Sequence, residues 1–566
     1  MKGAVNAVLA LLAIAAAGQA QAAPAPVADI IFQHGTIIPM TAPDARAEAV
    51  AVKDGRVLAL GSEAAMARLR GKATRVVDLA GQTLLPGFID AHGHLTALAR
   101  MAAMVPLASP PVGPVTDIAG LQAALRERLK AQPGDGWIVG NGYDDSLLAE
   151  HRHPTRAELD AVSADRPIFI MHVSGHLATL NTRALDLAGM LHPAADPPGG
   201  VIHREADGRT ASGPIEETAI FMAMRLLAPP SLDQQLAQLD EAQRVYARNG
   251  LTTAQDGATM PDAWDLLAEA ARRSRLILDV DAVPLLAAKW PALDSLPFTA
   301  AYAGHLRAAG IKLIIDGSPQ GRTAWLSEPY HQPPPGQDAR YAGYRQVPDE
   351  VLRASLRRAA NHGWQVYAHV NGDAAIQQLI DAVRAVNADG GTPLVRPVAV
   401  HAQTARHDQL VAMKALGIVP SFFAAHTFYW GDWHREVVLG AERAERISPQ
   451  REAIDLGLAP TIHNDAPIVP PDMIRLVWSA ATRRTRSGDI LGAAERVSVF
   501  EALGEVTRNA ALQLGEDGIK GTIEPGKYAD FVVLSANPLA TAPEDLLRLK
   551  VSATYKQGRA IYSAAN

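Results

Sequence analysis

Two histidines separated by one residue follow an apolar segment near the start of the chain. The motif Asp90-Ala91-His92-Gly93-His94 comes directly after residues 84–89, which are typical of a buried strand. Side chains two positions apart on an extended chain point to the same side, so both imidazoles can reach one metal ion. Two hydrogen-bonded structural histidines are the alternative. The position at the exit of a buried strand favours the metal site.

A lysine stands inside another apolar segment. Lys312 lies in Ile311-Lys312-Leu313-Ile314-Ile315-Asp316. Because a buried, unpaired ammonium group costs several kcal/mol, Lys312 needs a compensating partner. One alternative is an ion pair with Asp316 on the same face of the strand. The other is a neutral amine that has captured carbon dioxide as a carbamate, an anion whose two oxygens can bridge two cations. The sequence leaves both open.

Three further polar residues follow short apolar segments. His369 comes after residues 365–368, His401 after residues 398–400, and Asp465 shortly after residues 459–462. Alone, each histidine is more often a core residue, and an aspartate at such a place more often caps a turn or helix. Their recurrence at successive strand ends indicates an active site, because parallel barrels gather catalytic groups at the carboxyl ends of their strands.

The segments that carry these residues alternate with helical ones, which predicts an α/β fold with a parallel sheet. Periodicity alone does not choose between a doubly wound sheet and a closed barrel. The β-rich segments 29–77 and 529–562 predict a small sheet domain built from both chain ends. The predicted strands of the middle are residues 84–89, 137–139, 167–170, 276–283, 311–315, 365–368, 398–400, 418–420 and 459–462, and the predicted helices include residues 232–248, 349–362, 374–386 and 406–416.

Composition narrows the function. The net charge is -6 with acids and bases interspersed, which excludes the basic surface of a nucleic-acid-binding protein. Cysteine is absent, so thiol catalysis and disulfides are excluded. Lys2, the apolar residues 4–17 and Ala20-Gln21-Ala22 are typical of an export signal. The alternative, a membrane span, needs about 20 apolar residues. We expect a secreted or periplasmic protein that begins near Ala23.

The motifs together resemble the amidohydrolase superfamily, and in particular the amidohydrolase 3 subgroup that contains N-substituted formamide deformylases. The resemblance covers nearly the whole chain after the export signal. It rests on residues 85–94, Ser174-Gly175-His176 with Asn181, residues 213–217, residues 311–318, His369 with Gly372-Asp373, His401-Ala402-Gln403, Asn464-Asp465-Ala466-Pro467 and residues 521–530.

The resemblance implies a (β/α)₈ TIM barrel with a small β-sandwich domain. The expected bounds are 1–22 for the signal peptide, 23–85 and 518–566 for the two parts of the sandwich, and 86–517 for the barrel. The resemblance further implies one or two divalent metals, most often zinc, and a carbamate on Lys312. Asp465 would bind metal and accept the proton of the attacking water. The implied metal ligands are His92, His94, Lys312, His369, His401 and Asp465.

Two segments depart from the family pattern. Ala399-Val400 precede His401 where a glutamate is common, and His463-Asn464 precede Asp465 where Gly-Ser is frequent. These departures bear on contacts around the ligands and on substrate fit. His176, which follows an apolar strand, is the candidate donor to the oxyanion of the reaction, with a purely structural histidine as the alternative.

We therefore predict an enzyme that hydrolyses a non-peptide C–N bond, amide or formamide-like, with a metal-activated hydroxide. A lactone, ester or phosphoester would suit the same hydroxide. A non-catalytic exported binding protein is the other alternative, although a structural zinc needs only four ligands. The expected partner is a small-molecule substrate, without nucleic acid and without a membrane span in the mature chain. An oligomer is compatible with the sequence.

Overall fold

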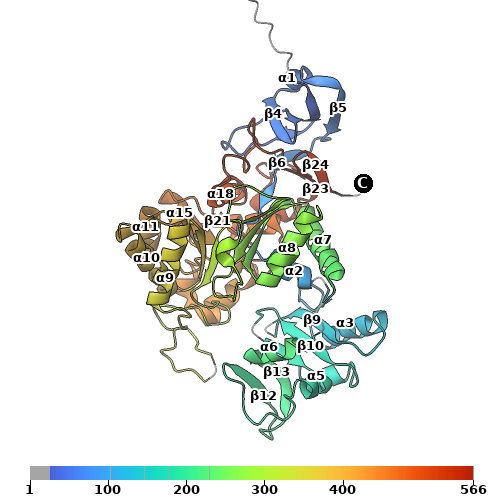
Figure 1. Cartoon of the computed structure of the whole chain (residues 1–566), viewed down its shortest axis with the longest axis vertical. Coiled ribbons are helices and arrows are strands. Elements are labelled where there is room, and N and C mark those ends of the chain that lie inside the picture. The colour runs from blue at the N-terminus through green and yellow to red at the C-terminus, as the bar shows by residue number, and fades with distance from the viewer. Residues whose placement is uncertain are drawn as a thin grey trace, which may run out of the picture.

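The computed structural model describes residues 26–564 except 102, 146, 176, 228–229 and 335. Three parts follow one another along the long axis in Figure 1: a β-rich part that contains the first and last described strands, an α/β body and a second lobe. The predicted export signal, residues 1–22, and His176 lie outside the described residues, so their roles stay predictions. Within the described ranges, no helix is both long and apolar enough to cross a bilayer.

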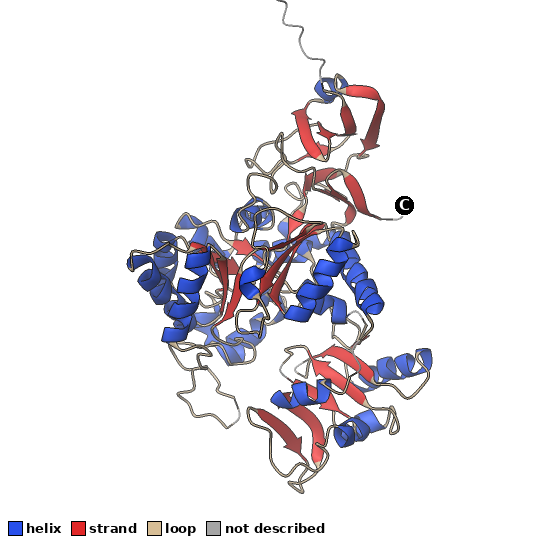
Figure 2. Ribbon diagram, in the orientation of Figure 1, coloured by secondary structure: helices blue, strands red, loops and turns tan. Residues whose placement is uncertain are grey.

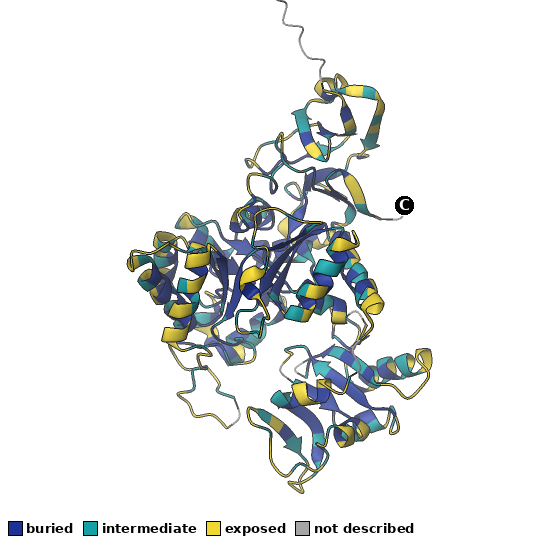
Figure 3. Ribbon diagram, in the orientation of Figure 1, coloured by how far each residue is buried: buried dark blue, intermediate teal, exposed yellow. Residues whose placement is uncertain are grey.

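The body contains parallel strands in two sheets. All pairings within each sheet are parallel, and a parallel bridge between Leu285 and Lys312 links the two. These strands are almost wholly buried (Figure 3). The first sheet has the order β16 (Leu306–Ala308), β15 (Asp279–Pro284), β14 (Leu251–Thr259), β7 (Phe88–Ile89), and the second β17 (Ile311–Ile314), β18 (Gln365–Val370), β19 (Val395–His401), β20 (Val419–Phe422), β21 (Thr461–Ile462).

Helices flank these strands (Figure 2), which gives the predicted α/β character. Helices α7 and α9 have the bounds expected from their apolar periodicity, because Ser231 caps the first with a capping box and Gly363 ends the second in the left-handed region. The main helices are α2 (Leu95–Met101), α7 (Leu232–Arg248), α8 (Pro261–Arg272), α9 (Asp349–His362), α10 (Asp373–Ala388), α11 (His407–Leu416), α16 (Met473–Thr482) and α18 (Arg508–Gln513).

Both chain ends contribute to the β-rich part. In one sheet an N-terminal strand, β6 (Thr83–Pro86), pairs antiparallel with a C-terminal strand, β22 (Phe531–Leu534). One hydrophobic cluster, including Phe32, Leu84 and Phe531, contains side chains from both chain ends. The two sheets are β4 (Arg56–Gly61), β3 (Ala49–Lys53), β1 (Ala28–Gln33), β5 (Arg70–Asp78), and β2 (Thr36–Ile37), β6 (Thr83–Pro86), β22 (Phe531–Leu534), β23 (Val551–Lys556), β24 (Arg559–Ser563).

The second lobe is an insertion between α2 and α7 that the sequence did not indicate. The predicted strands at 137–139 and 167–170 lie in this lobe rather than in the parallel sheets of the body. They form a parallel pair flanked by helices, which has the same local pattern as the body. Its mixed sheet has the order β12 (Gly200–Arg204), β13 (Ala211–Glu217), β11 (Leu177–Leu180), β10 (Ile168–His172), β9 (Ile138–Tyr143), β8 (Val105–Pro106).

A buried ion network fastens the C-terminal segment to the body. Asp279 on β15 accepts hydrogen bonds from Lys520 at 2.6 Å and from Lys556, and Lys556 also donates to Asp530 at 2.7 Å. All four side chains are almost fully buried. Burial alone would raise the pKa of Asp279, but the charges of the two lysines outweigh it and hold that pKa well below its usual value. The carboxylate is thus ionised and depends on both lysines.

Replacing Lys556 by methionine tests this network. K556M leaves buried carboxylates with too few cations, so we expect the free energy of unfolding to fall by about 3 kcal/mol or more. Urea unfolding followed by circular dichroism measures this change. K550M replaces an exposed lysine and should change stability by about 0.5 kcal/mol or less. Equal losses in the two variants would contradict the role given to the network.

Candidate metal centre

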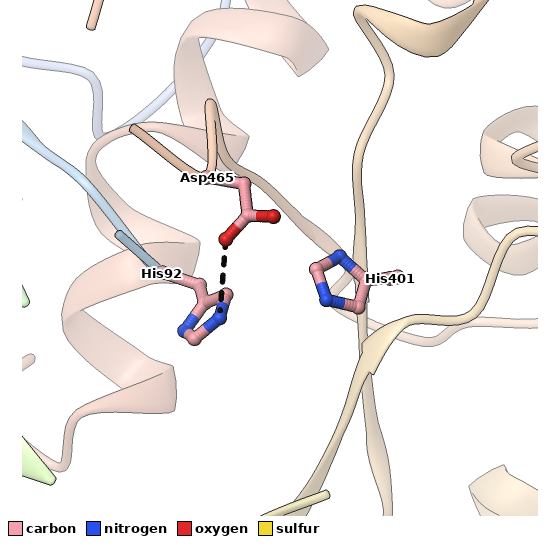
Figure 4. A group of neighbouring side chains, drawn as sticks. All are labelled: His92, His401 and Asp465. Carbon is pink, nitrogen blue, oxygen red and sulfur yellow. Dashed lines mark ion pairs between the residues drawn. The ribbon is translucent and has the colours of Figure 1, made fainter. Parts of the chain in front are cut away.

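The implied ligands come from five places in the chain and meet at one end of the parallel strands. His92 and His94 follow β7, and Lys312 lies within β17. The remaining three are His369 on β18, His401 as the last residue of β19, and Asp465 after β21. Figure 4 shows the side chains of His92, His401 and Asp465 pointing toward one another.

The donor atoms lie close together. The side chains of His92, His401 and Asp465 each offer one ligand atom, and these atoms lie within 4.8 Å of one another. Asp465 Oδ1 lies 3.4 Å from His92 Nε2 and 3.1 Å from His94 Nε2. His369 Nδ1 lies 3.1 Å from His401 Nε2.

These separations match those between ligands of one ion. With metal–nitrogen bonds of about 2.0–2.1 Å, two ligand atoms of a tetrahedral zinc lie roughly 3.3–3.4 Å apart. The observed contacts of 3.1 and 3.4 Å between Asp465 and the two histidines are close to this value. The arrangement therefore fits a divalent metal without a large movement of the side chains.

Hydrogen bonds to backbone carbonyls determine which ring nitrogens are free. A carbonyl oxygen only accepts, so His94 donates from Nδ1 to Gly257 at 2.6 Å and His369 donates from Nε2 to Gly317 at 3.0 Å. In the neutral rings the other nitrogens then carry lone pairs. His94 Nε2 thus faces the Asp465 carboxylate, and two acceptors at this distance require a proton or a metal ion between them.

Burial keeps most of the histidines neutral, which is the form that binds metal. Desolvation, followed by neighbouring positive charge, holds the pKa of His92 and of His401 well below the usual value and lowers that of His369 to about 4. His94 differs, because the hydrogen bond and charge of Asp465 outweigh its burial and raise its pKa.

Lys312 lies at the same centre. Its side chain is buried, and Nζ lies 2.8 Å from His92 Nε2. Burial lowers the pKa of Lys312 to about 7, so much of the amine is neutral near that pH. The alternative of an ion pair with Asp316 does not hold, because the Asp316 carboxylate accepts hydrogen bonds from the backbone N–H groups of Trp325, Asn371 and Gly372.

The backbone is strained where two of the ligands leave their strands. His401 has φ 74°, the following Ala402 has φ 45°, and Asp465 has φ 54°. Residues other than glycine rarely occupy this left-handed region, and such strain gathers at functional sites. In addition, the Asp465 N–H donates to the backbone carbonyl of His92 at 3.2 Å. The backbone thus holds Asp465 beside the histidine motif.

Strand β14 supports the histidine motif, and the sequence did not predict it. Gln255 Oε1 lies 2.6 Å from His92 Nδ1, and the Gly257 N–H donates to the carbonyl of Gly93 at 2.7 Å. Asp256 accepts from the N–H of Thr96 at the start of α2. In the sequence, Asp256-Gly257 follows a mostly polar segment and by itself is typical of a turn, so it did not indicate a strand.

Two cavities lie between the second lobe and the loops of the body. One has a volume of about 430 Å³ and a mainly apolar lining that includes Met101, Val105 and Val469. The other has about 250 Å³. Trp430 and Ile468 line both, and Ile468 lies three residues beyond Asp465. The cavities therefore adjoin one another and lie close to the loop that carries Asp465.

The second cavity contains a further group of polar side chains. Asp144, Asp145 and His172 bring ligand-type atoms within 4.8 Å of one another. His172 Nε2 lies 3.0 Å from Asp145 Oδ1, and His172 Nδ1 lies 2.8 Å from Ser174 Oγ. Both ring nitrogens of His172 therefore have a hydrogen-bond partner. The predicted oxyanion donor, His176, belongs to the same segment of the chain but lies outside the described residues.

An α/β fold with imidazole and carboxylate donors gathered at its strand ends is typical of metal-dependent hydrolases. The model of the amidohydrolase family matches residues 75–562, and the chain belongs to this family. The N-substituted formamide deformylase of Arthrobacter pascens is 27% identical over 545 residues, which covers 94% of this chain and 97% of that protein. YtcJ of Bacillus subtilis, described as an amidohydrolase, is 27% identical over 553 residues, which covers 94% and 99%.

A solved structure agrees. An uncharacterised metal-dependent hydrolase from Pyrococcus furiosus superposes with a TM-score of 0.71 at 25% identity, and the match covers 90% of this chain and 99% of that one. Together with the donor cluster, these similarities support a hydrolase with a divalent metal. The resemblance to amidohydrolases predicted from the sequence is confirmed.

Replacing Gly257 by alanine tests how closely β14 packs on the ligands. A Cβ at this position would lie 2.5 Å from His92 Cε1, so His92 must shift. We expect G257A to bind divalent metal about 10-fold more weakly or worse, measured by competition with a chelating indicator. G136A is the control, because a Cβ at Gly136 meets nothing within 4 Å. Unchanged affinity in G257A would contradict this view of the site.

Proposed function

We propose that the chain is a hydrolase that cleaves a non-peptide C–N bond, in an amide or formamide-like substrate, at a zinc centre. The observation that carries this proposal is the convergence of buried donors from His92, His401 and Asp465 within 4.8 Å. The similarity to a protein named as a formamide deformylase supports the choice of bond. The implied ligands are the six named from the sequence, including His94, Lys312 and His369.

We also propose that the two parallel sheets form one (β/α)₈ barrel, with β7, β14, β15, β17, β18, β19, β20 and β21 as its strands. The bridge between Leu285 and Lys312 joins the sheets on one side. On the other side, the Asp465 N–H bonded to the His92 carbonyl brings the segment after β21 next to the segment after β7. The part built from both chain ends would be the β-sandwich.

The proposed reaction adds water to the substrate carbonyl and breaks the bond to nitrogen, which gives an acid and an amine. A divalent metal in this centre would polarise the carbonyl and lower the pKa of a water molecule. Asp465 would take the proton of that water and pass it to the leaving nitrogen, because an amide nitrogen leaves poorly until it is protonated. Burial would raise the pKa of Asp465, but His94 and nearby positive charge outweigh it and lower that pKa, so the carboxylate is ionised and able to accept.

Lys312 would serve this centre as a carbamate. Burial lowers the pKa of Lys312 to about 7, so about half of the amine is neutral near that pH, and a neutral amine can add to carbon dioxide with release of a proton. The resulting anion would replace a buried cation by a ligand. Its charge would then balance that of the metal, which removes the cost of a buried, unpaired ammonium group.

The cavities beside the centre suggest where the rest of the substrate would lie. The larger one presents Met101, Val105, Trp430 and Ile468, and suits an apolar substituent on the nitrogen or on the carbonyl carbon. The smaller one presents Asp145 and His172. A substrate of moderate size with an apolar part would fit this junction between lobe and body.

The function is tested by measuring hydrolysis of N-formyl amines, N-acyl amines, lactones and phosphoesters by the metal-loaded protein. We expect the amides to give the highest kcat/KM. D465N should lower kcat by about 100-fold or more, because it removes a proton acceptor. D54N is the control, since the Asp54 side chain is 82% exposed. Faster cleavage of lactones or phosphoesters would replace the proposed bond, and inactivity on every class would favour a binding protein.

The carbamate is tested separately with ¹³C-labelled bicarbonate. We expect the protein to show a carbamate carbon resonance that K312A loses and K130A keeps, because Lys130 is an exposed lysine with a side chain that is 72% accessible. A parent protein without this resonance would remove the carbamate from the proposal. The hydrolysis measurements would then stand on the remaining ligands.

A further inference from the structure

A line of buried polar side chains runs from His401 away from the metal centre. His463, Ser421, Thr461 and Gln513 make it up, and the relative exposure of each is 0%. Ser421 and Thr461 are paired neighbours on β20 and β21, His463 directly follows β21, and Gln513 ends α18. His463 is one of the residues at which this chain departs from the family pattern.

The contacts along this line are short and continuous. Starting at the metal ligand, His401 Nδ1 lies 3.1 Å from His463 Nε2, and His463 Nδ1 lies 3.0 Å from Ser421 Oγ. Ser421 Oγ lies 2.8 Å from Thr461 Oγ1, which lies 2.6 Å from Gln513 Oε1. At the far end, Gln513 Nε2 donates to the backbone carbonyl of Ala91 at 2.9 Å.

The far end determines the direction of the first hydrogen bonds. The Ala91 carbonyl can only accept, so the nitrogen of the Gln513 amide must face it and the oxygen must face Thr461. The Gln513 oxygen in turn only accepts, so Thr461 donates its single hydroxyl proton there. The contact between Thr461 and Ser421 is then made with the proton of Ser421.

The same logic reaches the metal ligand. Because Ser421 gives its proton to Thr461, its oxygen accepts from the ring of His463, and the proton of His463 is on Nδ1. His463 Nε2 then carries a lone pair and accepts from His401, whose proton must be on Nδ1. In the neutral ring of His401 this leaves a lone pair on Nε2, the nitrogen that lies 3.1 Å from His369 Nδ1.

We propose that His463, Ser421, Thr461 and Gln513 are positioning residues that hold His401 in the tautomer that binds metal through Nε2. This inference rests on the proposed metal function of His401. Partners of this kind orient a ligand and fix its tautomer, and their loss weakens metal binding by about 10- to 100-fold. Here the direction of all these hydrogen bonds is set by one backbone carbonyl, that of Ala91, which belongs to the same motif as His92.

Reversing the direction of these hydrogen bonds would oppose metal binding by His401. Without an acceptor at Thr461, the Ser421 proton is free to turn toward His463 Nδ1. The His463 proton would then lie on Nε2 and point at His401 Nδ1. His401 would carry its own proton on Nε2, where the metal must bind. A change that removes a single hydroxyl, remote from the metal, thus opposes metal binding.

The test is T461V, which keeps the size of the side chain and removes the hydroxyl. We expect its dissociation constant for Zn²⁺, measured by competition with a chelating indicator, to rise by about 10-fold or more. T461S keeps the hydroxyl and should bind as the parent does. T554V is the matched control, because it removes another buried threonine hydroxyl, bonded to the carbonyl of Ala247 at 2.7 Å, in the part built from both chain ends.

A second measurement observes the tautomer of His463 in the parent protein itself. In the zinc-loaded protein labelled with ¹⁵N-histidine, long-range ¹H–¹⁵N spectra should show His463 protonated on Nδ1 and unprotonated on Nε2, with the signals assigned by loss in H463Q. A proton on Nε2 of His463 would overturn the proposal. So would parent-like zinc affinity in T461V.

Failure of this inference is distinguishable from failure of the proposed function. If H92A and H401A lose zinc while T461V and T554V bind as the parent does, the metal centre stands and the positioning role falls. If H92A and H401A bind zinc as tightly as the parent, the proposed metal function itself is wrong, and the positioning role of His463, Ser421, Thr461 and Gln513 is wrong with it.

Discussion

The central constraint on this protein is that hydrogen-bond acceptors lie close together in a largely buried place. Imidazole nitrogens and a carboxylate lie 3.1 to 3.4 Å apart, in a place where His92 is fully buried. Such an arrangement is unfavourable by itself, because buried acceptors without donors lose their hydrogen bonds to water. The parallel strands, the strained turns at His401 and Asp465, and the support from β14 all serve to hold it in place. A cation bound between these acceptors would satisfy them, so the same arrangement favours metal binding.

Much of the centre could be predicted because its residues follow strands that can be recognised from the sequence. His92, Lys312, His369 and His401 lie on or directly after short apolar segments, and such segments identify buried strands from local sequence alone. Parallel strands end on a common side, so residues at those ends are expected to meet. The helices at 232–248 and 349–362 were predicted with their observed bounds, because their ends carry capping residues and glycine.

The rest depends on contacts that local sequence does not contain. Strand β14 reads Leu-Thr-Thr-Ala-Gln-Asp-Gly-Ala-Thr, too polar for a buried strand, and only its neighbours explain why Gln255 and Asp256 are inside. The second lobe has the same alternation of strands and helices as the body, so periodicity could not separate the two. His463 was visible as a departure from the family pattern, but its place between His401 and Ser421 follows only from the pairing of distant strands.

The pairing of β6 with β22 has a consequence for how the chain is made. Strand β6 leaves the ribosome early, yet its antiparallel partner is among the last segments to be synthesised. One edge of β6 pairs with β2, but until β22 is made the other edge has no permanent partner, and contacts this far apart in sequence form slowly. The sheet that contains β6 and β22 must therefore remain incomplete for most of translation. Removal of the segment from β22 onward would leave β6 without its antiparallel partner and the two chain ends without their shared sheet.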